Sequence, residues 1–204
     1  MRHNKNYNNS TTLTRPVNTR KLRRFLIVCE GEKTEPNYFK QFPENPEVYD
    51  KIDIQGTGYN TVSLVNEAIR LKNDARRRKE PYIEVWCVFD KDNFSIDQFQ
   101  SAISLAGNNQ IRCAYSIEAF ELWYILHFNF YDAALSRKQY GEKLSDLLGK
   151  TYQKNDEGMY QLLAKRQSIA IQNAHKLYNF QYKLPLTEQN PITTVFLLVE
   201  RLSP

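Results

Sequence analysis

The first half of the chain alternates between short apolar runs and amphipathic segments, and this alternation limits the folds open to it. The apolar runs predict strands at 25–29, 49–55, 83–90 and 111–116. Between them, helical spacing of apolar residues predicts helices, one opened by Thr34 with Pro36 in its first turn and another capped by Ser95. Strands that alternate with helices predict an α/β fold, a mainly parallel sheet covered by helices on both faces.

After residue 117 the pattern becomes helical. Helices are expected over 118–128, 137–148 and 157–180, with a last helix opened by Asn190 and Pro191. We therefore expect an α/β core at 25–118 and a helical extension at 119–204 that packs on it. The two parts are expected to form one compact unit.

The net charge of +5 comes from the N-terminus. Residues 1–24 contain no acid and hold the basic residues Arg2, Lys5, Arg15, Arg20, Lys21, Arg23 and Arg24. This predicts a disordered basic arm that could follow a phosphate backbone or could be a solvated tail without a partner. The rest of the chain is slightly acidic.

The cysteines and the hydropathy indicate a soluble, cytoplasmic protein. Cys29, Cys87 and Cys113 lack metal-binding spacing and lie in apolar, strand-like segments, so we expect buried, reduced thiols. There is neither a secretory signal pattern nor an apolar run of the ~18 residues that a membrane span needs.

Carboxylates follow three of the predicted strands. Glu30 follows the first, Asp90 and Asp92 the third, and Glu118 the fourth. Glu35 lies in the first turn of the helix that follows the first strand, and Glu121 follows Glu118 by one helical turn. The carboxyl ends of parallel strands meet at one edge of a sheet, where ligands bind, so these groups are expected to converge.

Converging carboxylates repel one another unless a cation holds them. An all-oxygen set without His or Cys favours Mg²⁺ or Mn²⁺, which in such sites promotes phosphodiester cleavage. The alternative is that the Asp90–Asp92 pair is a solvated turn, that Glu35 and Glu118 complement helix N-termini, and that Glu30 is a surface residue.

The basic candidates also allow two interpretations each. Lys33 and Lys91 could neutralise the charge of a scissile phosphate or merely balance neighbouring acids. The run Arg76, Arg77, Arg78 and Lys79 could contact nucleic acid or complement the C-terminus of its helix. Lys154, Lys165 and Arg166 could line the entrance to the site.

His127 and the aromatic side chains around it fall on one helical stripe, in which core packing is the expected role. His127 could instead act as a general acid or contact a phosphate. The aromatic stripe could instead stack on bases; it comprises Phe120, Trp123, Tyr124, Phe128, Phe130 and Tyr131.

Four motifs, in order, resemble the RloB family, which is found beside restriction–modification and abortive-infection loci. They are "FLIVCEGEKTEPNYF" (25–39), "FDKDNF" (89–94), "SIEAFELWYILHF" (116–128) and "NPITTVFLLVERL" (190–202). The first two also resemble the Toprim domain of topoisomerases, primases and overcoming-lysogenisation-defect nucleases. The sequence departs from the pattern at Ile117, where many relatives carry Pro or Asn-Pro, a change of loop geometry.

The resemblance implies a Toprim-like, Mg²⁺-dependent nuclease that cuts RNA or DNA in antiphage defence, with a separately encoded partner ATPase. It makes Glu30 the acid/base or a metal ligand, Asp90 and Asp92 ligands, Glu35 the second acidic residue of the motif, Glu118 an additional ligand and Glu121 a less certain one. Two other classes stay open: a non-catalytic module that senses a nucleotide or nucleic-acid end, and an assembly subunit whose acidic rim docks a partner.

Overall fold

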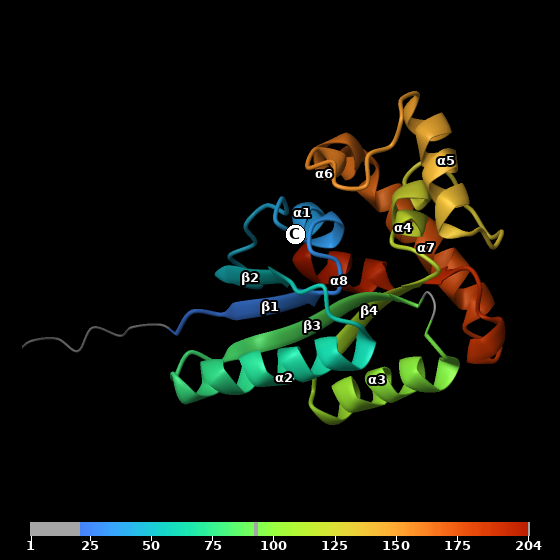
Figure 1. Ribbon diagram of the computed structural model, residues 1–204. Helices are drawn as coiled ribbons and strands as arrows, with labels where there is room; N and C mark the ends of the chain where they lie inside the picture. The colour runs from blue at the N-terminus through green and yellow to red at the C-terminus, as the bar shows by residue number, and fades with distance from the viewer. Residues whose placement is uncertain (1–20, 92–93, 204) are drawn as a thin grey trace, which may run out of the picture.

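The computed structural model describes residues 21–91 and 94–203, and its centre is a five-stranded sheet in the order β2-β1-β3-β4-β5 (Figure 1). The strands β1 (Arg24–Cys29), β2 (Lys51–Gly56), β3 (Tyr82–Lys91) and β4 (Arg112–Ile117) are mutually parallel, and only the short β5 (Ile192–Thr193) is antiparallel to its neighbour. The predicted α/β fold with a mainly parallel sheet is confirmed.

Helices cover both faces of this sheet. On one face lie α2 (Thr61–Arg77) and α3 (Ile96–Asn108), which bury side chains such as Leu64 and Phe99 against Val28 and Phe89. The other face carries α1 (Thr34–Phe39), α4 (Glu121–Leu126), α7 (Gln167–Gln181) and α8 (Val195–Leu202). The larger of the two cores lies here and joins residues of the strands to residues of the C-terminal half.

The aromatic stripe of residues 120–131 contributes to this larger core. Phe120, Trp123 and Tyr124 are fully buried, and Tyr38 of α1 contacts the rings of Phe120 and Tyr124 edge-on or tilted. Burial of large aromatic surfaces is the main source of stability in such a layer. The rings of Phe120, Trp123 and Tyr124 therefore have no face open for stacking on bases.

The predicted helix ends need correction in the C-terminal half. The helix α5 (Arg137–Leu148) has the predicted bounds, but the helix expected over 157–180 is divided into α6 (Met159–Leu163), a 3₁₀ turn η1 (Ala164–Arg166) and α7. A second 3₁₀ turn, η2 (Leu186–Glu188), precedes Asn190 and Pro191. No helix begins at these two residues, because β5 comes first and α8 begins only at Val195.

The C-terminal residues complete the sheet itself. Thr193 pairs with Ser116, and their side-chain oxygens are 2.9 Å apart. The backbone N–H of Thr194 donates to the carbonyl oxygen of Tyr115 at 2.8 Å, and the Arg201 side chain in α8 binds Glu84 of β3. The helical extension is thus joined to the α/β core by the strand ladder as well as by packing.

The remaining expectations concern thiols and termini. Cys29 and Cys87 are buried, Cys113 is half-buried, and none of the three forms a disulfide; burial raises the pKa of all three thiols. Within residues 21–91 and 94–203, no helix is both long and apolar enough to cross a membrane. Residues 1–20 of the predicted basic arm lie outside the described residues.

Candidate functional site

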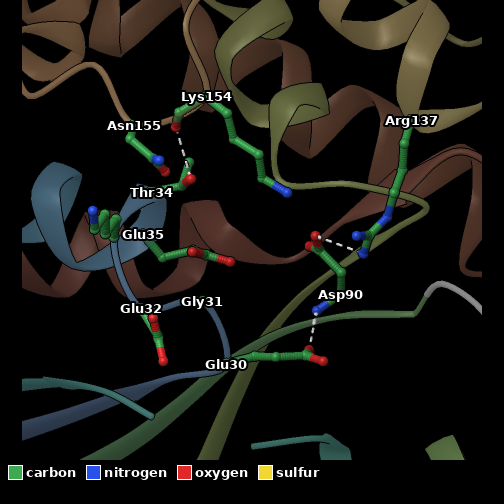
Figure 2. A pocket seen from close by; sticks show the side chains of 10 residues that line it. Glu30, Gly31, Glu32, Thr34, Glu35, Asp90, Arg137, Lys154 and Asn155 are labelled. Atoms are coloured by element: carbon green, nitrogen blue, oxygen red, sulfur yellow. Dashed lines mark hydrogen bonds and ion pairs between the residues drawn. The ribbon is translucent and has the colours of Figure 1, made fainter. Parts of the chain in front are cut away.

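The site begins at the carboxyl ends of β1 and β3, where Glu30 and Asp90 are neighbours. The backbone N–H of Glu30 donates to the carbonyl oxygen of Val88 at 2.8 Å, and the N–H of Asp90 donates to Glu30 Oε2 at 3.1 Å (Figure 2). Glu30 follows β1 and Asp90 lies near the end of β3, and because these two strands are paired and parallel, the register of the sheet fixes the distance between the two residues. The predicted convergence of these two acids follows from this geometry.

Glu35 approaches the same space from the first turn of α1. Its side chain is buried, with 6% of the residue exposed, and Oε2 has no hydrogen-bond partner within the described part of the chain. Gly31 makes room for this carboxylate, since a Cβ atom at Gly31 would overlap Glu35 Oε2. A buried acceptor without a donor is costly in a folded protein, and this orphan oxygen suits a cation or a proton.

Glu121 at the start of α4 is the fourth acid. It is 7% exposed, and its Oε1 accepts a hydrogen bond of 3.0 Å from the hydroxyl of Tyr152. Its charge raises the pKa of both Glu35 and Asp90, so it belongs to the same electrostatic group. In the sequence, Glu121 ranks after Glu118 as a candidate ligand.

Glu118, the stronger candidate in the sequence, lies outside the cavity lining. Its side chain accepts a long hydrogen bond of 3.5 Å from Asn190 Nδ2, and its carbonyl oxygen accepts from Arg137 Nε at 3.3 Å. The polypeptide turns between the end of β4 at Ile117 and the start of α4 at Glu121, so the helical turn that would have brought residues 118 and 121 to one face does not form here.

Glu30, Glu35 and Asp90 line one cavity, and Glu121, which is not part of the lining, acts on Glu35 and Asp90 through its charge. Burial raises the pKa of Asp90 well above its ordinary value, and the charges of Glu35, Glu121 and Glu30 raise it further, while Arg137 opposes the shift. Burial likewise raises the pKa of Glu35, with a further contribution from Glu121. Such a group is stabilised by uptake of positive charge, either as protons or as a bound cation.

Two cations from the C-terminal half face these acids across a cavity of about 420 Å³. Arg137 Nη2, at the start of α5, lies 3.3 Å from Asp90 Oδ2, and Lys154 extends its side chain over the cavity from the α5–α6 connection (Figure 2). Arg137 and Lys154 each lower the pKa of Glu35. The cavity is lined by Glu30, Gly31, Glu32, Lys33, Thr34, Glu35, Asp90, Arg137, Lys154 and Asn155.

The structure separates the cations that the sequence suggested. Lys33 is exposed and lines the cavity, whereas Lys91 is half-buried at the end of β3 and is not part of the lining. Arg166 packs over the ring of Phe128, with 4.8 Å from its Cζ to the ring centroid, and neither it nor Lys165 is part of the lining.

The basic run of Arg76, Arg77, Arg78 and Lys79 is exposed, but it lies at the other end of the sheet. Glu80, which follows the run directly, pairs at 3.0 Å with Arg24, the first residue of β1. The carboxylates instead lie at the carboxyl ends of β1 and β3. A nucleic-acid strand bound at the carboxylates would not also contact this basic run unless the nucleic acid passed along the length of the sheet.

His127 is a core residue in this structure. It is fully buried, its Nδ1 lies 2.9 Å from the carbonyl oxygen of Trp123, and burial lowers its pKa to about 4. This environment holds the imidazole neutral and away from solvent. The candidate role as a phosphate contact has no exposed surface to support it.

The donor set fits a hard divalent cation, although no cage is preformed. All four acids offer oxygen donors of the kind that Mg²⁺ and Mn²⁺ prefer. In the described part of the chain, no three His, Cys, Asp or Glu side chains already gather as a metal cluster. Asp92, the fifth predicted ligand, lies outside the described residues.

These features define an α/β protein with an acidic site at the carboxyl edge of a parallel sheet, closed on one side by cations from a helical region. Residues 25–202 match the family described as RloB-like protein. The chain therefore belongs to the RloB-like family, as its motifs suggested. No curated protein and no solved structure matches it.

Proposed function

We propose that this protein is a metal-dependent nuclease that hydrolyses phosphodiester bonds of RNA or DNA. The observation that carries the proposal is the group of four carboxylates, Glu30, Glu35, Asp90 and Glu121, in which burial and, after it, mutual repulsion raise the pKa of Asp90 and Glu35. Acidic groups of this kind cluster where a protein binds a cation or transfers a proton. The facing Arg137 and Lys154 suit the negative charge of a phosphate.

Glu30, Glu35, Asp90 and Glu121 would hold Mg²⁺ or Mn²⁺, together with Asp92. The bound ion would supply an activated water and stabilise charge on the leaving oxygen. Lys33 and Lys154 would orient the scissile phosphate, and Arg137 would balance the charge that develops on it. Glu118 would act indirectly, because its carbonyl oxygen holds the Arg137 guanidinium.

The proposed role in antiphage defence, with a separately encoded ATPase as partner, rests on the family to which the chain belongs. An effector that destroys nucleic acid must be restrained until infection, and a partner could supply that restraint. Its activity alone could therefore be low. Metal binding is the more direct first test of the site.

The test is calorimetric titration of Mn²⁺ into the wild-type protein and the Asp90→Ala/Asp92→Ala variant. We expect binding by the wild type and a loss of at least tenfold in affinity in the variant. The matched control is Asp132→Ala/Glu188→Ala, which removes two acids from exposed positions and should bind Mn²⁺ as the wild type does. Equal binding by all three proteins would refute the metal site and favour an assembly subunit.

A cleavage assay then separates a nuclease from a sensor. Labelled tRNA, single-stranded RNA, single-stranded DNA and duplex DNA would be incubated with the protein and Mg²⁺ or Mn²⁺, with and without the partner ATPase. Products that disappear in Asp90→Asn would support the proposal. Metal and nucleic-acid binding without products under all of these conditions would identify a sensing module instead.

A further inference from the structure

The connection between α5 and α6, residues 150–158, forms a roof over the carboxylates. Thr34 Oγ1 donates to the carbonyl oxygen of Lys154 at 2.7 Å, and Asn37 Nδ2 donates to that of Asn155 at 3.4 Å. Gln41 Nε2 donates in turn to the carbonyl oxygen of Glu157. Three successive turns of α1 and its extension thus bind the backbone of the roof.

The roof is fixed on its other side as well. The Tyr152 hydroxyl donates to Glu121 Oε1 at 3.0 Å, and the Tyr152 N–H donates to Ser145 Oγ in α5 at 3.0 Å. Within the roof, Lys150 pairs with Asp156 at 3.3 Å, and Asp156 accepts from the N–H of Gly158. Because the roof is bound at both sides and internally, it is a fixed part of the site rather than a free loop.

The roof limits which molecules can reach the carboxylates below it. Asp90 and Glu35 are 8% and 6% exposed, so a reacting phosphate must enter the cavity rather than touch its rim. The cavity of about 420 Å³ is near the lower end of the range for sites that enclose small ligands. A duplex, with two strands on opposite sides of its base-pair stack, is too wide to enter beneath the roof.

We propose that the site accepts a single-stranded segment of nucleic acid, such as a loop, an end or a gap, and excludes a continuous duplex. One strand passes between α1 and the α5 N-terminus, with its phosphates against Lys154 and Arg137. Contacts between cationic side chains and the phosphate backbone are part of the usual way in which proteins hold single strands. This inference rests on the proposed nuclease function, but its test does not require cleavage.

The test measures binding by fluorescence anisotropy, with the full-length Asp90→Asn protein in Ca²⁺ so that no cleavage occurs. The probes are a single-stranded 20-mer, the blunt duplex of the same sequence, and a hairpin with a short loop. We expect the single strand and the hairpin loop to bind at least tenfold more tightly than the duplex. Equal or tighter binding of the duplex, or no binding of any probe, would overturn the inference.

A roof variant provides the second measurement. Thr34→Val/Asn37→Ala/Gln41→Ala removes the three side chains that fasten the roof to α1, and we expect the ratio of single-strand to duplex affinity to fall toward one. The matched control is Thr187→Val/Asn66→Ala/Gln100→Ala, which makes the same changes at exposed sites elsewhere and should keep the ratio. An unchanged ratio in the roof variant would also overturn the inference.

The two proposals can fail separately. If single strands bind preferentially but the wild-type protein cuts no probe with any metal, with or without the partner ATPase, the nuclease function fails and the selectivity stands. If duplex and single strand are cut and bound equally, the nuclease function stands and the selectivity fails.

Discussion

Gly31 shows how one residue fixes the position of a carboxylate. It lies between Glu30 and the helix that carries Glu35, and a Cβ atom at this position would overlap the Glu35 carboxylate. The packing at this point is close enough that even one methyl group requires a shift. The position of the acid therefore depends on the absence of a side chain four residues earlier.

We predict that Gly31→Ala displaces Glu35 and weakens Mn²⁺ binding at least tenfold, at a cost of about 1–3 kcal/mol in unfolding free energy. Calorimetry and thermal denaturation measure the two effects. Gly107→Ala is the control, since nothing lies within 4 Å of its added Cβ in α3. That substitution should stabilise the protein by up to ~1 kcal/mol and leave Mn²⁺ binding unchanged; a Gly31→Ala protein with full affinity would contradict the prediction.

The buried His127 leads to a prediction about pH. Its pKa is about 4 in the folded protein and about 6.5 when unfolded, so the unfolded chain binds more protons between these values. Stability from this residue is therefore present above pH 6.5 and is lost as the pH falls toward 4. Between pH 7 and pH 4.5 the loss amounts to about 2 kcal/mol.

The test is the variant His127→Gln, which keeps a donor for the Trp123 carbonyl oxygen but does not titrate. Urea denaturation at pH 7 and pH 4.5 should show a fall in unfolding free energy that is smaller by about 2 kcal/mol than in the wild type. All other titrating groups are common to the two proteins and cancel. An equal fall in both would show that His127 is protonated in the folded state.

The site residues differ in how far the sequence could predict them. Glu30 could be predicted because it directly follows an apolar strand, and Asp90 because it lies at the end of another; parallel strands end at one edge of the sheet. Glu121 could not be ranked above Glu118, since that order depends on where the chain turns out of β4. Arg137 is 47 residues from Asp90 in the chain and Thr34 is 120 from Lys154, and no local pattern reports contacts at such separations.

Among the elements, α5 has the most direct connection to the site, because its first residue is Arg137. Ser136 caps this helix through a capping box with Gln139, and Ser95 caps α3 in the same way with Gln98. The two caps are chemically alike, but only the helix capped by Ser136 begins with a residue, Arg137, that contacts Asp90. They form a natural matched pair for experiment.

We predict that Ser136→Ala and Ser95→Ala each lower the unfolding free energy by about 1 kcal/mol, which differential scanning calorimetry measures as about 2–4 °C in Tm. Only Ser136→Ala should also reduce cleavage of a single strand, by about tenfold, because the end of α5 frays and Arg137 loses its position. Equal effects of both variants on cleavage would argue against a role for Arg137.

Elements with strong local signals were predictable, and those set by tertiary contacts were not. The strand at 83–90 and the helix at 137–148 lie within one residue of β3 and α5 at each end. The helix expected over 157–180 is interrupted at η1, where Arg166 turns to cover Phe128. The strand β5 is only two residues long and exists because β4 offers its edge, so periodicity could not reveal it.

At the scale of the whole molecule, the larger of the two cores depends on the helix α8. Val195, Phe196, Leu198, Val199 and Leu202 of α8 are buried in the larger core, which also contains Phe25, Ile27 and Trp86 of the sheet. Without the C-terminal half, only α1 would cover this face of the sheet, and most of the face would be exposed to water. Apolar surface of this extent is not stable in a monomer.

We predict that residues 25–118 alone do not fold cooperatively, although they contain four strands and the helices α1 to α3. Far-UV circular dichroism during heating, with limited proteolysis, should show a gradual transition and rapid digestion. The same measurements on residues 21–203 should show a sharp transition. A sharp transition in the 25–118 fragment would mean that the α/β core is an independent domain.

The late position of the roof and of β5 in the chain has a consequence for the order in which the site is assembled during translation. Translation delivers Glu30 and Asp90 first, the roof at 150–158 later, and Ile192 and Thr193 later still. Contacts between residues so distant in sequence form late in folding. A nascent chain that ends before the roof therefore carries the acids without the groups that complete their cavity, and the cell meets a complete site only after the roof and β5 have been made.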